Sequence, residues 1–219
     1  MAMTIGAVLV PRRLDVYKVH NKVYSVRMTK DRILAAAGAV LEREGIEGLT
    51  IRKVAQRAEL SPMALYRHFA DKDALLNALM EEGLAAWEKI VRAIRAQDPL
   101  EWLKAVGEAH LAFALAQPHL YDAAFFLPAP AARQFPGDFA QGRSPVITLA
   151  MARIEQAKAD KRLCDRPTLE IALAFAACGY GLVVMHRANR FESEKQFKTL
   201  FRAAQRLLLD SLKPAVEAK

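Results

Sequence analysis

Residues 50–72, TIRKVAQRAELSPMALYRHFADK, carry the most informative pattern in the chain. Apolar residues recur at helical spacing in two short segments, with a turn at Leu60 between them. This pattern predicts two helices joined by a tight turn, which is the arrangement of a helix-turn-helix. The inward positions of the first segment are Ile51, Val54, Ala55 and Ala58, and those of the second are Leu65 and Phe69.

The starts of both helices have a chemical signature. Thr50 and Ser61 each precede a segment, and their hydroxyl oxygens can accept a hydrogen bond from a free N–H of the first turn. Pro62 follows Ser61, and proline suits the first helical position because it has no N–H to leave unpaired. The outer side of the second helix then carries Pro62, Met63, Tyr66, Arg67 and His68, a face that suits a DNA groove.

The segment from Lys30 to Leu76 resembles the tetracycline-repressor (TetR) family of transcriptional regulators. The resemblance consists of a helix with Ile33, Ala37, Val40 and Leu41, a break at Gly45, LTIRKVAQRA at residues 49–58, and LYRHF at residues 65–69 followed by Lys72 and Leu75. It implies that Tyr66, His68 and Lys72 contact DNA phosphates or base edges. The full set of expected DNA-binding residues is Thr50, Arg52, Ser61, Pro62, Met63, Tyr66, Arg67, His68 and Lys72.

Two residues depart from the family's usual pattern. Glu59 occupies the turn position at which the family usually has glycine, so a left-handed backbone there would cost about 1 kcal/mol. Met63 stands near the start of the recognition helix, where a small residue is usual. Both departures affect the details of DNA docking.

The composition is that of a globular protein, with 219 residues of which 53% are apolar and 26% are charged. The formal charge of +8 is uneven. Residues 1–72 hold 13 Lys and Arg against 7 Asp and Glu, whereas residues 73–219 hold 19 against 17. The basic excess therefore lies at the end of the chain expected to bind DNA. The two cysteines, Cys164 and Cys178, and the lack of a signal-peptide pattern favour a reducing, cytoplasmic location.

The sequence predicts an all-α protein with three parts. Residues 1–27 form a basic N-terminal extension, interpreted either as a disordered tail or as an arm for the minor groove, with Met28 as an alternative natural start. Residues 28–72 form a three-helix DNA-binding domain, whose first helix is expected to start at Thr29 and end at Gly45. Residues 73–219 form a helical domain for ligand binding and dimerisation.

The larger domain is expected to begin with one long helix that continues to Asp98-Pro99. A proline- and glycine-rich loop over residues 127–145 is predicted to cover a cavity or the surface. Residues 169–186 are apolar and rich in small residues, but the uninterrupted apolar run is short of the roughly 20 residues that span a bilayer, so no membrane partner is expected. Ser193 and Gln196 predict a capping box before the last helix.

The last two helices carry apolar residues that require partners. Within one chain a short bundle could bury them, so the sequence alone favours a homodimer only modestly. The resemblance implies that both helices pair with their copies in a second subunit to form a four-helix bundle. A two-fold dimer would also place two recognition helices one DNA turn apart on a palindromic operator.

No catalytic or metal-binding motif stands out in the sequence, and no cofactor is expected. A small apolar effector is expected instead, because the resemblance implies a ligand cavity in the second domain. His110 is interpreted either as a core histidine or as a ligand contact. The candidate ligand-binding residues are Trp87, Trp102, His110, Phe113, Tyr121, Phe125, Met151 and Phe175, with Tyr180 nearby.

These features predict a homodimeric repressor that binds a palindromic double-stranded DNA operator and is released by a small molecule. One alternative is an enzyme or carrier whose helix-turn-helix is vestigial. A second alternative is a protein that coats DNA without sequence preference. Footprinting on the DNA beside the protein's own gene distinguishes the three.

Overall fold

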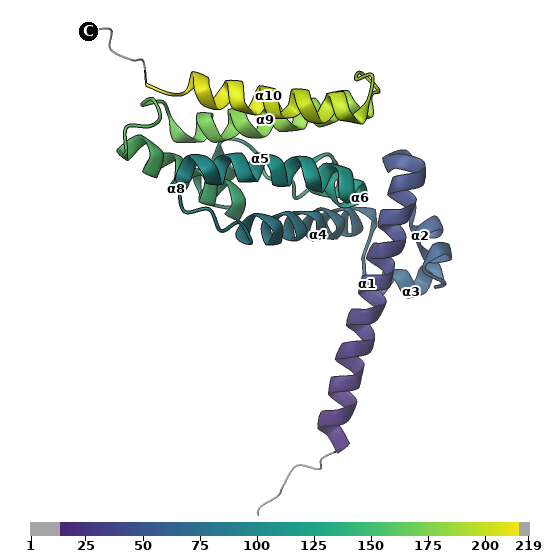
Figure 1. Ribbon diagram of the computed structural model, residues 1–219. Coiled ribbons are helices and arrows are strands. Elements are labelled where there is room, and N and C mark those ends of the chain that lie inside the picture. Colours follow the sequence, from purple (N-terminus) through teal and green to yellow (C-terminus); the bar gives the residue numbers. More distant parts are fainter. Residues whose placement is uncertain (1–13, 215–219) are drawn as a thin grey trace, which may run out of the picture. The chain divides into compact units, whose positions relative to one another are not determined.

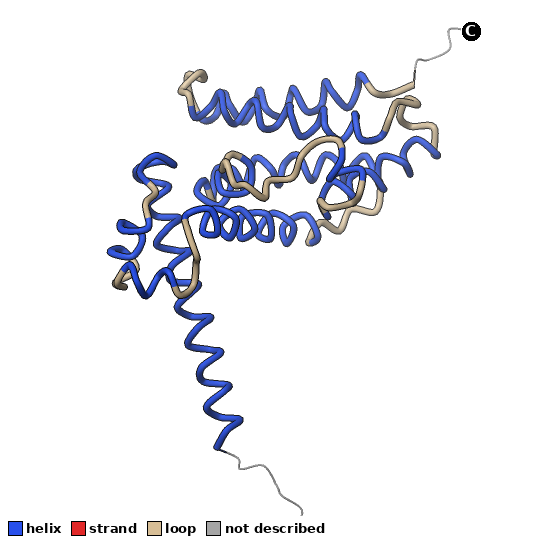
Figure 2. Tube along the Cα trace, turned by 180° about the vertical axis from the view of Figure 1, so that it is seen from behind, coloured by secondary structure: helices blue, strands red, loops and turns tan. Residues whose placement is uncertain are grey.

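A computed structural model describes residues 14–214, with side chains described from Thr29 onward. Within this range the chain forms ten α-helices and no strand, which confirms the predicted all-α fold (Figures 1 and 2). The chain divides into two compact units, Met1–Lys72 and Asp73–Lys219. Residues 1–13, the first half of the predicted basic extension, lie outside the described residues.

The N-terminal unit contains α1 (Leu14–Gly48), α2 (Ile51–Arg57) and α3 (Pro62–Tyr66). The expected helix start at Thr29 is wrong, because α1 begins at Leu14 and runs through that residue. Residues 14–37 contain neither glycine nor proline, so nothing in this stretch stops the helix. The predicted break at Gly45 is present, since this residue has a φ of 66° and interrupts the last turns of α1.

The three helices enclose a small apolar core. Ile33 and Ala37 of α1, Val54 of α2 and Leu65 of α3 have no exposed surface, and Leu49 between α1 and α2 is equally buried. These residues lie at the spacings expected from the sequence, and burial of each large aliphatic side chain contributes about 1.5–3 kcal/mol. The core therefore fixes α2 and α3 against α1 and determines which side of α3 faces outward.

The C-terminal unit is a bundle of longer helices. It contains α4 (Lys72–Arg92), α5 (Pro99–Ala116), α6 (Pro118–Phe125), α7 (Gly137–Ala140), α8 (Pro145–Ala159), α9 (Thr168–Arg187) and α10 (Glu194–Ser211). α4 ends earlier than expected, because the N–H groups of Ala93 and Ile94 donate to carbonyls three residues back and the helix tightens and stops. The largest side chains that are fully buried in this unit are Tyr121, Phe113, Phe197, Phe201, Leu75, Leu79, Ile154 and Ile171.

The connection between α6 and α8 is irregular, as predicted, apart from the single turn of α7. It crosses the face of the C-terminal unit seen in Figure 2. Two contacts hold it to α4: the Ala131 N–H donates to Asn77 Oδ1 at 2.9 Å, and Arg133 pairs with Glu81 at 3.2 Å. The loop is thus positioned over α4 by specific polar contacts.

The helix α9 has a buried side and an exposed side. Ile171, Ala172 and Val183 are buried against neighbouring helices, whereas Leu173 and Val184 are 38% and 49% exposed. By length and composition α9 is the one described helix that could cross a membrane, a test that core helices of soluble proteins also pass. Its buried side packs against α5, α8 and α10.

Candidate nucleic-acid interface and ligand cavity

The short helix α3 presents two different sides. Leu65 is buried, and Phe69, which follows the helix, is 4% exposed. On the other side Met63 is 70% exposed and Tyr66 49% exposed, and both Pro62 and Arg67 are exposed as well. Large apolar and aromatic side chains in such positions provide contact surface for a partner.

The predicted N-caps of α2 and α3 are both present. Oγ1 of Thr50 accepts a hydrogen bond from the Lys53 N–H at 3.3 Å, and Oγ of Ser61 accepts one from the Ala64 N–H at 3.1 Å. A hydroxyl group that accepts in this way keeps its own hydrogen for a second bond. Both exposed hydroxyls can therefore donate to a phosphate oxygen while they cap their helices.

The turn between α2 and α3 has the left-handed residue that the sequence predicts. Glu59 has a φ of 56°, which strains a side-chain-bearing residue by about 1 kcal/mol. Arg32 of α1 offsets part of this strain, because its guanidinium donates to the Ala58 carbonyl at 2.8 Å and lies 4.0 Å from the Glu59 carboxylate. No local sequence pattern indicates this role of Arg32, since its partners lie in a distant turn.

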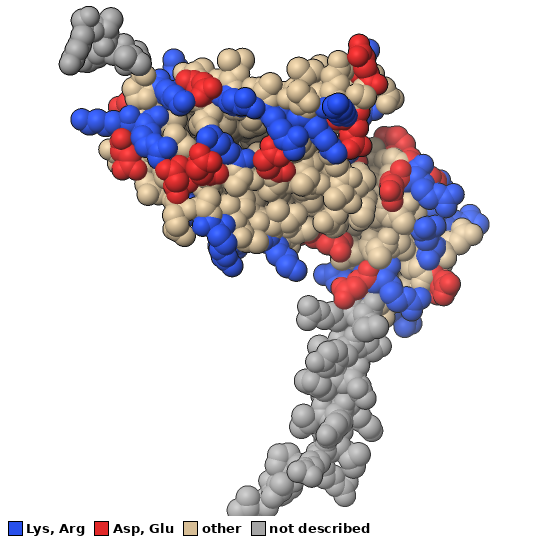
Figure 3. Space-filling model, in the orientation of Figure 1, with Lys and Arg blue, Asp and Glu red and all other residues tan. Residues whose placement is uncertain are grey.

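Several exposed cations on this unit are available to an anionic partner, and three of them are predicted DNA contacts. Arg52, Arg67 and Lys72 are exposed and form no ion pair with any described residue. Lys53 differs, because its ammonium pairs with Glu44 and thereby lowers the pKa of that carboxyl. Figure 3 shows lysine and arginine side chains on the surface of this unit around α2 and α3. His68, the remaining predicted contact, is half-buried.

Five of the predicted ligand-binding residues meet in one aromatic cluster of the C-terminal unit. His110 is its centre, with Trp87 at 5.7 Å, Tyr121 at 5.2 Å and Phe125 at 5.9 Å between ring centroids. Phe113 stacks on Trp87 at 5.8 Å. Tyr180 joins the cluster from α9, 5.2 Å from His110 and 4.8 Å from Phe125.

Two cavities border this cluster. The first, which we call the loop cavity, has a volume of about 270 Å³ and lies between α4, the end of α6, the 127–145 loop and the start of α8. The second, which we call the inner cavity, has a volume of about 60 Å³ and reaches His110. Trp87, Val146, Ile147 and Tyr180 line both, so the two cavities adjoin.

The inner cavity has few polar groups. His110 is 7% exposed, and its Nε2 forms a hydrogen bond of 2.5 Å with the Tyr121 hydroxyl. Burial lowers the pKa of His110 from 6.5 to about 4, so the ring is neutral at pH 7. Burial likewise raises the pKa of Tyr180, whose hydroxyl stays protonated. These groups can exchange hydrogen bonds with a ligand, but they provide no charge to bind it.

The structure places the predicted ligand-binding residues differently with respect to the two cavities. Trp87, His110, Phe125 and Phe175 line one or both cavities, while Phe113 and Tyr121 lie behind the walls and support them. Trp102 and Met151 line neither cavity. Trp102 instead packs under the guanidinium of Arg153 at 5.8 Å, a contact that no local sequence pattern indicates.

Polar residues at the cavity walls were not predicted. Arg133 and Glu81 line the loop cavity, and Gln205 of α10 lines the inner cavity. None lies in a motif, and Arg133 is 52 residues away from its partner in the chain. The proline- and glycine-rich composition of the loop was the only available signal.

Two family models match the chain. Residues 33–79 match the model for bacterial regulatory proteins of the tetR family, and residues 103–208 match the model for the tetracyclin repressor-like C-terminal domain. Between them they cover both units. Among solved structures, a protein of unknown function from Rhodococcus sp. RHA1 has a TM-score of 0.68 with 26% identity, over 85% of this chain and 96% of the other.

A second solved structure, a putative TetR family transcriptional regulator from Vibrio parahaemolyticus, has a TM-score of 0.61 over 84% of this chain and 98% of the other. At 20% identity, this likeness shows a common fold alone.

Curated relatives match part of the chain. Tetracycline repressor protein class E from Escherichia coli is 41% identical over 59 residues, which is 27% of this chain and 28% of the relative. The class G protein from Vibrio anguillarum is 34% identical over 87 residues, or 40% of each chain. The chain thus spans between about a quarter and two-fifths of the curated relatives it matches.

Proposed function

This chain belongs to the tetR family of bacterial regulatory proteins, and we propose that it is a ligand-responsive repressor. In this proposal a homodimer binds a palindromic operator and leaves it when a small apolar molecule occupies the C-terminal unit. The observation that carries the proposal is the division of α3 into a buried side with Leu65 and an exposed side with Met63 and Tyr66.

The proposed DNA contacts fall into two groups. Tyr66, His68 and Lys72 contact phosphates and so fix the position of the protein on the duplex. Pro62, Met63 and Arg67 lie nearest the bases, where an arginine can bind the edge of a guanine with two hydrogen bonds. Three further residues, Thr50, Arg52 and Ser61, are proposed to bind phosphates through their hydroxyl or guanidinium groups.

The proposed dimer uses the exposed apolar sides of α9 and α10. Leu207 is 72% exposed and Leu200 44% exposed on α10, and both lie on one side of that helix because they are seven residues apart. On α9 the surface around Ala177 and Gly181 is open, with no atom within 4 Å of the position that a Gly181 Cβ would take. Small residues of this kind allow two helices to approach closely.

The proposed effector site is the pair of adjoining cavities. The inner cavity is largely apolar, and its neutral His110 and Tyr180 offer hydrogen bonds without charge. In the loop cavity the charges of Arg133 and Glu81 are paired with each other. The combined volume is at the lower end of the range for small-molecule sites. An uncharged molecule with a mostly apolar body matches these walls.

The proposed coupling runs along α4. This helix starts at Lys72, a proposed phosphate contact, and its later turns bring Leu84 and Trp87 to the wall of the loop cavity. A change in its tilt would alter the spacing of the two recognition helices. Such coupling is typically about 1–3 kcal/mol, or about 5- to 150-fold in affinity, and operator DNA must weaken effector binding by the same factor. Equal effector affinities with and without operator would exclude this linkage.

Footprinting on the DNA beside the protein's own gene tests the proposal directly. A symmetric protected region with two half-sites one helical turn apart is expected. Arg67→Ala should relax the preference among operator sequences, because it removes a contact to a base edge. Protection that spreads along the DNA without a boundary would identify a nonspecific coating protein, and no protection at any site would contradict a DNA-binding function.

A further inference from the structure

A further cavity of the C-terminal unit is a groove between α5 and α10. Its volume is about 650 Å³, and Phe175 is the only predicted ligand-binding residue that lines it. On α5 the groove extends from Leu100 to Glu108, which corresponds to about 12 Å of helix axis. Its apolar floor consists of Leu100, Leu103, Phe175, Phe201 and Leu209.

The rim of the groove is predominantly basic. Five cationic side chains and two acidic ones, Glu108 and Asp210, line it. Figure 3 shows charged side chains of both signs gathered along the side of this unit where α5 and α10 lie. The five cations are Lys104, Arg162, Arg202, Arg206 and Lys213.

Four of these cations already have acidic partners, but the pairs are exposed. Arg202 binds both oxygens of Glu108 at 2.7–3.0 Å, and Lys213 lies 2.8 Å from Asp210. Exposed pairs of this kind contribute only about 0–1 kcal/mol to stability. An incoming anion can therefore displace the carboxylate of Glu108 or Asp210 from its cation. Arg206 has no ion pair with any described residue and is available at once.

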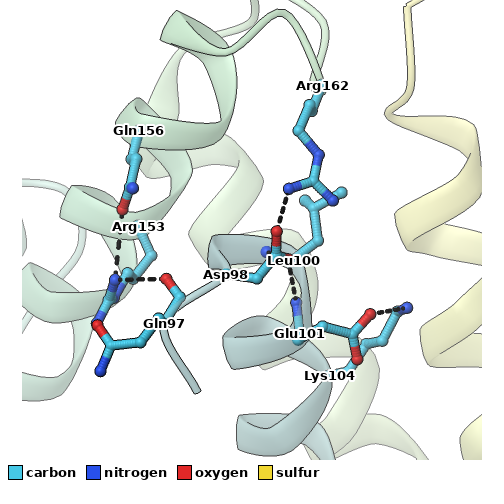
Figure 4. Close-up of polar contacts among 8 residues, drawn as sticks. All are labelled: Gln97, Asp98, Leu100, Glu101, Lys104, Arg153, Gln156 and Arg162. Carbon is cyan, nitrogen blue, oxygen red and sulfur yellow. Dashed lines mark hydrogen bonds and ion pairs between the residues drawn. The ribbon is translucent and has the colours of Figure 1, made fainter. Parts of the chain in front are cut away.

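One end of the rim is fixed by a polar cluster around the start of α5 (Figure 4). Oδ1 of Asp98 accepts from the N–H groups of Leu100 and Glu101 at 3.0 Å each, and Oδ2 pairs with Arg162. Arg162 thereby lowers the pKa of Asp98. Lys104 lies 2.7 Å from Glu101 on the same turn, so two cations are held beside this end of the groove.

The groove adjoins the inner cavity that reaches His110. Leu103, Gly107, Phe175 and Gln205 line both spaces. Gly107 keeps the junction open, since a Cβ there would lie 3.5 Å from Oε1 of Gln205 and any longer side chain would enter the groove. A ligand in the groove can thus extend its apolar end towards the aromatic cluster.

We propose that this groove binds a single-chain amphipathic anion, an alkyl chain with a carboxylate or phosphate head. The head lies between Arg206 and Lys213, and the alkyl chain follows the apolar floor towards Gln205. The elongated floor favours an extended chain, and the basic rim favours an anion over a neutral head. The groove is separate from the proposed dimer surface, because Leu200 and Leu207 do not share a face of α10 with Arg202.

The site is tested by calorimetric titration of the full-length protein, without DNA, using decanoate, decyl phosphate and decanol below their micelle concentrations. Decanoate or decyl phosphate should bind with one molecule per chain and more tightly than decanol, and the tighter of the two identifies the head group. Octanoate should bind about 15-fold more weakly than decanoate, because each buried CH₂ contributes about fourfold in affinity. Equal affinities for octanoate and decanoate would exclude burial of the chain.

Three matched substitutions locate the head. Arg206→Gln should weaken decanoate by up to about fivefold and leave decanol unchanged, which is the size of one exposed ion pair. Lys195→Gln, an exposed α10 residue outside the groove with no ion pair to a described residue, should change neither ligand. If Arg133→Gln weakens decanoate and Arg206→Gln does not, the anion enters at the loop cavity and the proposal is wrong.

Blocking the junction between the groove and the inner cavity independently tests where the alkyl chain of the ligand lies. Gly107→Leu should weaken both decanoate and decanol by about tenfold or more, with Ala152→Leu on the exposed side of α8 as the control for added bulk. Thermal unfolding of each variant checks that it is folded. Unchanged binding by Gly107→Leu would overturn the proposal, whereas the footprint on DNA, and with it the proposed function, would stand.

Discussion

Replacement of Gly83 by alanine should destabilise the C-terminal unit, although alanine is the better helix former. A Cβ at this position of α4 would meet the backbone carbonyl of Leu120, the Ala124 nitrogen at 2.7 Å and the Ala124 Cβ at 3.0 Å, all on α6. The higher helix propensity of alanine relative to glycine would by itself stabilise α4 by about 1 kcal/mol. Separation of two helix backbones costs about 1–3 kcal/mol or more, and this site lies at the upper end because backbone atoms are in the way.

The net loss in the free energy of unfolding should be about 1–2 kcal/mol, which lowers Tm by about 2–8 °C for a chain of this size. Differential scanning calorimetry measures this shift. Gly107→Ala is the matched control, because its Cβ would find only ordinary contacts with Gln205, the nearest at 3.5 Å, and should leave Tm unchanged or higher. A Tm for Gly83→Ala equal to that of Gly107→Ala would refute the close approach of α4 and α6.

Three further measurements test other parts of the molecule. Lys72→Ala should weaken binding to all DNA sequences about equally and reduce the slope of log affinity against log salt by about one per site, and an unchanged slope would contradict a phosphate contact. Gly181→Leu and Leu207→Asp should each yield monomers in sedimentation velocity, and an unaltered dimer in both would indicate another interface. Stability should fall as the pH is lowered from 6.5 to 4, because the unfolded chain binds a proton on His110 that the folded chain excludes. This contributes about 3 kcal/mol to the change in the free energy of unfolding, and His110→Phe should reduce the dependence of stability on pH.

The helix-turn-helix could be predicted from the sequence because its determinants are local. Thr50 and Ser61 each accept a hydrogen bond from an N–H only three residues further along the chain, and the inward positions follow from helical spacing. The strain at Glu59 was expected from the family resemblance, because glycine is usual at this turn position. The start of α1 was not predictable, because Thr29 has the chemistry of a cap but residues 14–28 before it contain neither glycine nor proline.

For the cavities, the sequence could predict only which types of residue gather in the second unit. The sequence indicated that aromatic residues would gather in the second unit, and Trp87, His110 and Phe125 do so. It could not indicate which of them face a cavity, because that depends on how helices distant in the chain cross. Trp102 illustrates the limit, since nothing in its neighbourhood distinguishes it from Trp87, yet it packs against α8 rather than a cavity.

The two-sided helix α9 has a consequence for directed evolution of this protein. Phe175 and Tyr180 form part of the cavity walls, while Leu173 and Val184 lie exposed on the same helix. A rigid helix transmits a rotation or shift from one side to the other, so a screen for altered ligand response should recover substitutions on the exposed side as well as in the walls. Libraries restricted to wall residues would miss these variants, and recombining hits from both sides should give effects that are not additive.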